Sequence, residues 1–184
     1  MNFGLYLPLL AGLACCNHFR LPPQARMEQA LPSALAMGLA TTIMLLCASS
    51  LSGLAGPGHD AAGLPPLLWP LLSLAISALL LSLGLHRFAA RQTQQLGLGW
   101  PWLLTNSLLA GLPLQWLLGP AGSAMQLLAP LLSAALFTLL LVQFATLPQR
   151  LQRCALPSWL SGQPALLLCA GIIALALHRL GVCL

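Results

Sequence analysis

Charged side chains are scarce in this 184-residue chain, which has seven arginines, two acidic residues and no lysine. Only 5% of the residues are charged and 59% are apolar, whereas a soluble domain carries about a quarter charged residues. So few charges cannot cover a surface that faces water, which excludes an ordinary soluble globular protein. We therefore predict an all-α membrane protein that forms a single polytopic domain over residues 1–184.

Side chains suited to catalysis are also few. Glu28 and Asp60 are the only acidic residues, and both fall between apolar stretches, so no carboxylate pair is available for general acid–base catalysis. The HExxH motif, a glycine-rich phosphate loop and the GxSxG motif are all missing. We predict no catalytic residue and no metal site within this chain alone. Because the arginines do not alternate with aromatic residues, the sequence also argues against nucleic-acid binding.

The six cysteines are scattered without a CxxC spacing, which argues against a disulfide framework. Cys15 and Cys16 are adjacent, and a helix points neighbouring residues about 100° apart. The two thiols therefore cannot readily bind one metal ion together. Cys16 is a candidate cofactor ligand only alongside ligands from another subunit, and the alternative is that both cysteines pack as small apolar residues.

Six apolar stretches can be assigned as membrane spans, for which about 20 residues are needed. They are expected at about residues 2–19, 31–54, 64–85, 99–118, 124–147 and 163–180. The sequence GPAG at 119–122 separates the fourth span from the fifth, because glycine and proline interrupt helices. The arginines fall between spans one and two, three and four, and five and six, and only Arg179 lies on the opposite side. Since cytoplasmic loops are rich in arginine, both termini are expected on the outer face.

An odd number of spans in each half predicts an inverted repeat, with half-repeats at approximately 1–91 and 92–184. Pro8 falls in the first span, and Pro101 and Pro113 fall in the fourth. These two spans occupy corresponding positions in the two halves. We therefore expect the first and fourth transmembrane helices to be interrupted.

Three adjacent polar residues, Thr105, Asn106 and Ser107, stand in the middle of the fourth span. Polar side chains can satisfy backbone groups that proline frees in the same helix. Alternatively, they can form the end of a half-helix that holds an ion or a cofactor. The residues alone leave both interpretations open.

Four stretches of the sequence occur in the same order as similar stretches in a known protein family. They are MGLATT at 37–42, LLTNS at 103–107, FATLPQRL at 144–151 and PSWLSGQPALLLCAG at 157–171. Together they resemble the RnfA/NqrE-type membrane subunits of the Rnf and Na⁺-NQR electron-transport complexes, and the likeness covers most of the chain.

The resemblance implies six spans in inverted triplets and a paralogous six-helix partner subunit in the bacterial inner membrane. It also implies a [2Fe–2S] cluster shared between the two subunits. The family's two cysteine positions fall here on Pro22 and Ser107, and cluster iron is held by thiolates rather than by such side chains. The resemblance therefore indicates a diverged subunit in which the cluster cysteines are not retained.

The function predicted from the sequence is that of an integral membrane subunit of an ion-translocating Rnf-type oxidoreductase complex. It would act as a scaffold and as part of the transmembrane electron or ion path, with both termini periplasmic. A small multispan transporter or channel unrelated to redox chemistry is the alternative. A purely structural assembly subunit is the third possibility.

Overall fold

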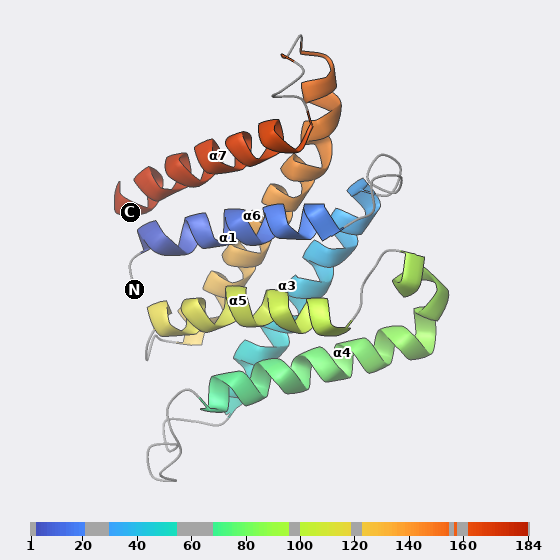
Figure 1. Cartoon of the computed structure of the whole chain (residues 1–184). Coiled ribbons are helices and arrows are strands. Elements are labelled where there is room, and N and C mark those ends of the chain that lie inside the picture. The colour runs from blue at the N-terminus through green and yellow to red at the C-terminus, as the bar shows by residue number, and fades with distance from the viewer. Residues whose placement is uncertain are drawn as a thin grey trace. The chain divides into compact units, whose positions relative to one another are not determined.

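The computed structural model describes residues 3–20, 30–54, 68–95, 100–118, 123–154, 157 and 162–183, and almost all of them are helical. The six helices are α1 (Phe3–Arg20), α3 (Ala30–Leu54), α4 (Leu68–Gln95), α5 (Trp100–Leu118), α6 (Ser123–Gln152) and α7 (Gln163–Cys183) (Figure 1). No strand occurs among the described residues. The prediction of an all-α protein with six helices is confirmed. Residues 119–122 lie outside the described residues, but α5 ends just before them and α6 begins just after them.

Proline sets where four of the helices begin. The second or third residue is Pro32 in α3, Pro70 in α4, Pro101 in α5 and Pro164 in α7. The N–H groups of a first helical turn have no acceptor within the helix, so proline loses nothing there and its fixed φ favours the helical conformation.

The predicted interruptions of the first and fourth helices are wrong, because α1 and α5 each run unbroken. Pro101 lies in the first turn of α5, where it cannot break a helical hydrogen bond. Pro8 removes one donor inside α1, but this helix continues through the proline to Arg20. Proline is tolerated in such helices where other groups satisfy the freed carbonyl.

Two of the predicted spans end too early in the sequence. The third span was expected to end near residue 85, but α4 continues to Gln95; the fifth was expected to end near 147, but α6 continues to Gln152. At about 1.5 Å per residue, these helices are longer than the roughly 30 Å hydrocarbon core of a bilayer. Arg87 and Arg150 are therefore exposed on helical extensions.

Among the described residues, three helices are long and apolar enough to cross a membrane, over Leu31–Leu51, Leu128–Gln152 and Gln163–Leu180. Two shorter apolar segments, Gly4–Phe19 and Leu71–Arg87, belong to α1 and α4. Large exposed side chains on the described helices are mostly leucine and isoleucine. Such a surface is stable against lipid, so the chain is a membrane protein.

The chain divides into two compact units, and the division falls inside α3 and α6. Unit 1 comprises residues 1–36 and 136–184, and unit 2 comprises residues 37–135. Each unit therefore takes helices from both halves of the sequence. The half-repeats at 1–91 and 92–184 stay a prediction.

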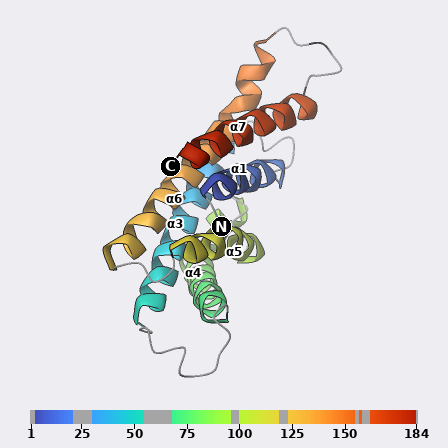
Figure 2. The same ribbon diagram turned by 90° about the vertical axis from the view of Figure 1, so that its left-hand side faces the viewer.

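Unit 1 contains α1 packed against α7, and the two helices run antiparallel (Figures 1 and 2). Tyr6, Leu10 and Ala14 lie on the buried face of α1. Their spacing of four residues places them on one side of a helix. The part of α6 in this unit buries Phe137 and Phe144.

Unit 2 contains α4 packed against α5, also antiparallel (Figures 1 and 2). A Cβ atom placed on Gly111 of α5 would lie 2.9 Å from a methyl carbon of Leu45 and 2.9 Å from one of Leu74. The missing side chain of Gly111 thus lets α3 and α4 approach α5 closely, as small residues do in membrane helix packing.

Candidate functional site: a buried polar seam in unit 2

The three polar residues of the fourth span do not act together. Thr105 is exposed and donates its hydroxyl hydrogen bond to the Pro101 carbonyl over 2.7 Å. Asn106 and Ser107 are fully buried, and rotations of about 100° and 200° around the helix separate them from the exposed Thr105. Only the second and third residues of the motif can therefore contribute to an internal site.

Two serines of α4 provide further buried hydroxyls. Ser73 and Ser77 are 2% and 3% exposed, and the Ser77 hydroxyl donates to the Ser73 carbonyl over 2.7 Å. Their spacing of four residues places them on the same face of the helix. Neither was predicted as a site residue, although two serines four residues apart in an apolar span are a recognisable signal.

The packing at Gly111 sets the register of this helix pair. Leu74 lies against Gly111. Because α4 and α5 are antiparallel and rise equally per residue, a residue a few positions after Leu74 lies at the same height as the residue equally many positions before Gly111. Ser77, three residues after Leu74, is therefore about level with Ser107, four residues before Gly111. We call Ser73, Ser77, Asn106 and Ser107 the polar seam of unit 2.

The seam offers neutral oxygen atoms rather than charge. The hydroxyl of Ser107 donates to the Leu104 carbonyl over 3.0 Å, and that of Ser77 donates to Ser73. A hydroxyl whose proton is engaged by the backbone keeps its oxygen lone pairs as acceptors. Oxygen lone pairs of this kind can replace the hydration of a cation in a membrane protein.

The threonines of the MGLATT stretch have similar backbone bonds on α3. Thr41 is fully buried and donates to the Met37 carbonyl over 2.8 Å, and Thr42 donates to the Gly38 carbonyl over 2.8 Å. These bonds satisfy the hydroxyls within their own helix. The arrangement fits close helix packing around Gly38.

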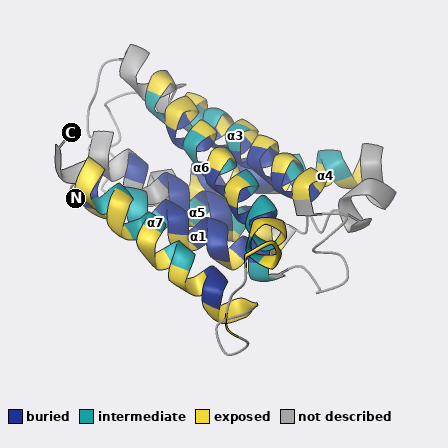
Figure 3. Cartoon of the chain, turned by 90° about the horizontal axis from the view of Figure 1, so that it is seen from above, coloured by how far each residue is buried: buried dark blue, intermediate teal, exposed yellow. Residues whose placement is uncertain are grey.

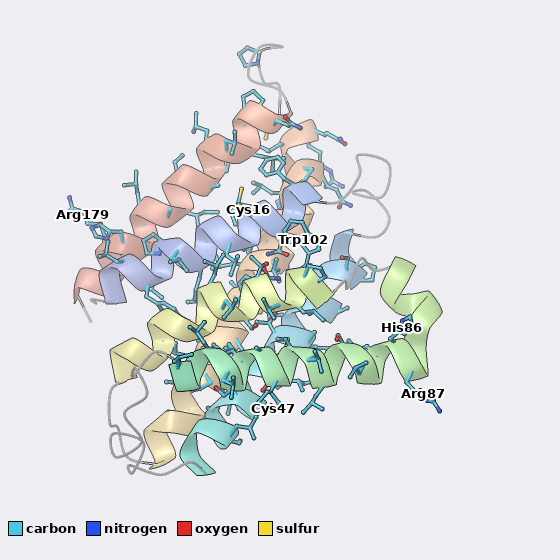
Figure 4. All side chains as sticks on the ribbon, turned by 60° about the horizontal axis from the view of Figure 1, so that its bottom comes forward. Cys16, Cys47, His86, Arg87, Trp102 and Arg179 are labelled. Atoms are coloured by element: carbon cyan, nitrogen blue, oxygen red, sulfur yellow. The ribbon has the colours of Figure 1, made fainter. Side chains whose placement is uncertain are left out.

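Cys16 belongs to unit 1, whereas the polar seam belongs to unit 2. Cys15 is buried and Cys16 is exposed on α1 (Figure 4), which is consistent with the angle of about 100° predicted between the adjacent thiols. Arg87 and Arg179 project away from their helices in the same view. Cys16 is a single thiol, and its role in cofactor binding stays a prediction.

Ser107 does not fit the role of a thiolate ligand to the [2Fe–2S] cluster that the resemblance implies at its position. A cluster shared between two subunits takes only part of its ligands from each, and no group of three or more His, Cys, Asp or Glu side chains that could hold a metal ion occurs among the described residues. Ser107 presents a hydroxyl that is engaged by its own helix, and iron–sulfur clusters are held by thiolates. Pro22, the other position implied by the resemblance, lies outside the described residues.

Comparison with known proteins gives a consistent set of relatives, each of them the RnfA-type component of an ion-translocating oxidoreductase complex. The chain is 30% identical over 151 residues to the protein from Rhodobacter capsulatus, covering 78% of this chain and 76% of that protein. It is 30% identical over 182 residues to the protein of the same name from Azoarcus sp., covering 93% of each. The Cereibacter sphaeroides protein of that name is 30% identical over 151 residues, covering 78% of this chain and 76% of that protein. No protein-family model matches the chain.

Proposed function

Because the chain belongs to the RnfA family of ion-translocating oxidoreductase complexes, we propose that it is a scaffold whose polar seam lines part of the complex's ion path. The chain is an Rnf-type membrane subunit, and its helical, apolar structure accords with that assignment. The observation that carries the proposal is the burial of Asn106 and Ser107 on α5, together with Ser73 and Ser77 on α4. Buried polar groups in membrane proteins often mark an ion or substrate pathway.

The chemistry of the seam supports a path for cations rather than for electrons. Its hydroxyl oxygens keep lone pairs available, and Ser107 offers a hydroxyl where the resemblance implies a thiolate. Neutral oxygens bind a partly dehydrated cation weakly enough for it to leave again. This protein would therefore guide an ion while the electron carriers reside on other subunits of the complex.

The partner and the orientation follow from the same proposal. A paralogous six-helix subunit is the expected neighbour in the bacterial inner membrane. The exposed arginines Arg87, Arg150 and Arg153 would lie on the cytoplasmic side, where arginine is enriched. Both termini would then be periplasmic.

Reconstituted complexes provide the test of the ion path. Complexes carrying Ser107→Ala and complexes carrying Thr105→Ala are compared for electron transfer and for ion uptake into the same vesicles. Each change removes one hydroxyl that donates to its own helix backbone, but only Ser107 is buried in the seam. We expect Ser107→Ala to reduce the number of ions moved per electron several-fold and Thr105→Ala to leave that ratio unchanged. Equal ratios in both variants would limit the protein to a scaffold.

The transporter alternative is separated by affinity purification of the tagged chain from its native membrane. A member of the complex is expected to bring flavin- and iron–sulfur-containing subunits with it in fixed proportion. A chain that purifies alone and moves a solute or an ion without electron transfer would contradict membership in a working complex.

A further inference from the structure

A carbonyl of α1 is left without its usual helical partner. Pro8 has no N–H group, so it cannot donate to the carbonyl four residues earlier, which belongs to Gly4. Both residues lie within α1, which starts at Phe3. Gly4 is also buried, and a buried carbonyl that loses its donor destabilises the protein unless another donor replaces it.

That donor comes from the other end of the sequence. The Nδ1 atom of His178, on α7, lies 2.6 Å from the Gly4 carbonyl oxygen, although 174 residues separate the two. A carbonyl oxygen can only accept, so Nδ1 must carry the proton. The contact therefore fixes the tautomer of the His178 ring.

The remainder of α7 shows why this bond is important. Ala165 and Leu166 are buried near the start of α7, but none of the described side chains from Leu167 to Leu180 is buried. Figure 3 shows this face of α7 as mostly exposed positions. Bilayer lipid is as apolar as leucine, so side chains of this kind gain little by choosing a helix over lipid.

We propose that His178 replaces the donor that Pro8 lacks, and that this bond holds the C-terminal half of α7 against α1. We call the arrangement of Pro8, Gly4 and His178 the clasp. It explains how α1 stays continuous through a proline and what fixes the exposed end of the last helix. The clasp lies wholly in unit 1 and is independent of the ion path proposed for the seam.

A double-mutant cycle tests the clasp in the full chain purified in detergent. In the natural background, His178→Leu should lower the midpoint of thermal unfolding by about 3–6 °C. In a Pro8→Ala background the helix regains its own N–H, so His178→Leu should lower the midpoint by less than about 1 °C. An equal loss in both backgrounds would overturn the proposal.

Two further variants separate donation from simple packing. His178→Asn keeps a side-chain N–H close to the ring position of Nδ1, and it should restore more than half of the midpoint that His178→Leu loses. His86→Leu is the matched control, because His86 also precedes an arginine but is exposed on α4; its midpoint should not change. A His178→Asn variant as damaged as His178→Leu would contradict the donor role.

Nitrogen NMR of the natural chain labelled on histidine gives a direct reading of the tautomer. The proton that His178 shares with Gly4 should reside on Nδ1, and the signal is assigned by its loss in His178→Leu. A ring protonated on Nε2 would contradict the clasp, since Nδ1 could then not donate to Gly4.

Discussion

The two helix pairs, α1 with α7 and α4 with α5, use polar groups in opposite ways. In the α4–α5 pair, the hydroxyls of Ser77 and Ser107 are buried, and each donates to its own helix. In the α1–α7 pair, the polar contact of His178 crosses from one helix to the other. The first arrangement leaves oxygen lone pairs inside a unit, whereas the second uses a side chain to join two helices.

The two pairs occupy corresponding places in the chain. Numbered within each half of the sequence, α1 and α5 are first helices, and α4 and α7 are third helices. Each first helix packs against the third helix of the other half. Two related triplets would give this pairing, so the pairing supports the half-repeats, which stay a prediction. The α4–α5 pair is closely packed and contains buried hydroxyls, whereas the α1–α7 pair is joined by the clasp and leaves most of α7 exposed.

The largest expected effect concerns the closeness of packing. Gly111→Leu inserts a side chain where even a Cβ would lie 2.9 Å from two leucines, so it should lower the free energy of unfolding by about 3 kcal/mol. Gly12→Leu, on the exposed face of α1 where nothing lies within 4 Å, should change it by less than about 0.5 kcal/mol. Chemical or thermal unfolding of the two purified variants measures the difference. Similar losses would remove the packing contrast between the pairs.

A smaller effect is expected from the buried amide of the seam. Asn106→Leu retains an approximate side-chain size but removes a fully buried amide that interacts with its surroundings, which should cost about 1–3 kcal/mol. Thr105→Val, at the exposed neighbouring position, should cost about 0.5 kcal/mol or less. The unfolding free energies of both variants, measured in the same detergent, provide the comparison. If Asn106→Leu lowers the unfolding free energy no more than Thr105→Val does, the buried amide does not stabilise the protein through polar interactions.

The smallest effect on stability is expected from the hydroxyl of Ser77. Its bond returns to the helix backbone, where the Ser73 carbonyl already accepts from the main chain, so Ser77→Ala should change the unfolding free energy by about 0.5 kcal/mol or less. Thermal unfolding of the purified chain measures it. A loss above about 2 kcal/mol would assign Ser77 a structural role comparable with that of a buried hydrogen-bonded group.

Much of the fold could be predicted from the sequence, because apolar runs and proline positions act locally. The order of the six helices, the end of α5 at Leu118 and the different exposure of the adjacent Cys15 and Cys16 all follow from such patterns. The interruption predicted at Pro8 was wrong, because a donor 174 residues away satisfies the freed carbonyl. A local pattern cannot reveal such a distant partner.

The candidate site was predicted only in part for a similar reason. The polar run at 105–107 drew attention to α5, but only the fold separates the exposed Thr105 from the buried Asn106 and Ser107. Ser77 is assigned to the polar seam because the contact of Gly111 with Leu74 sets the register between α4 and α5. The sequence alone does not contain that register.

Ser77 therefore provides the most direct test of the central claim that the polar seam lines the ion path. Its assignment to the seam depends on the structure alone, because no sequence motif predicted it. The measurement is the number of ions moved per electron by reconstituted complexes carrying Ser77→Ala or Ser82→Ala, two changes on α4. Ser82 is only partly buried, and its hydroxyl donates to the Leu79 carbonyl over 3.0 Å. We predict a ratio that falls several-fold in Ser77→Ala and stays at the natural value in Ser82→Ala. A natural ratio in Ser77→Ala would contradict the proposal that the polar seam lines the ion path.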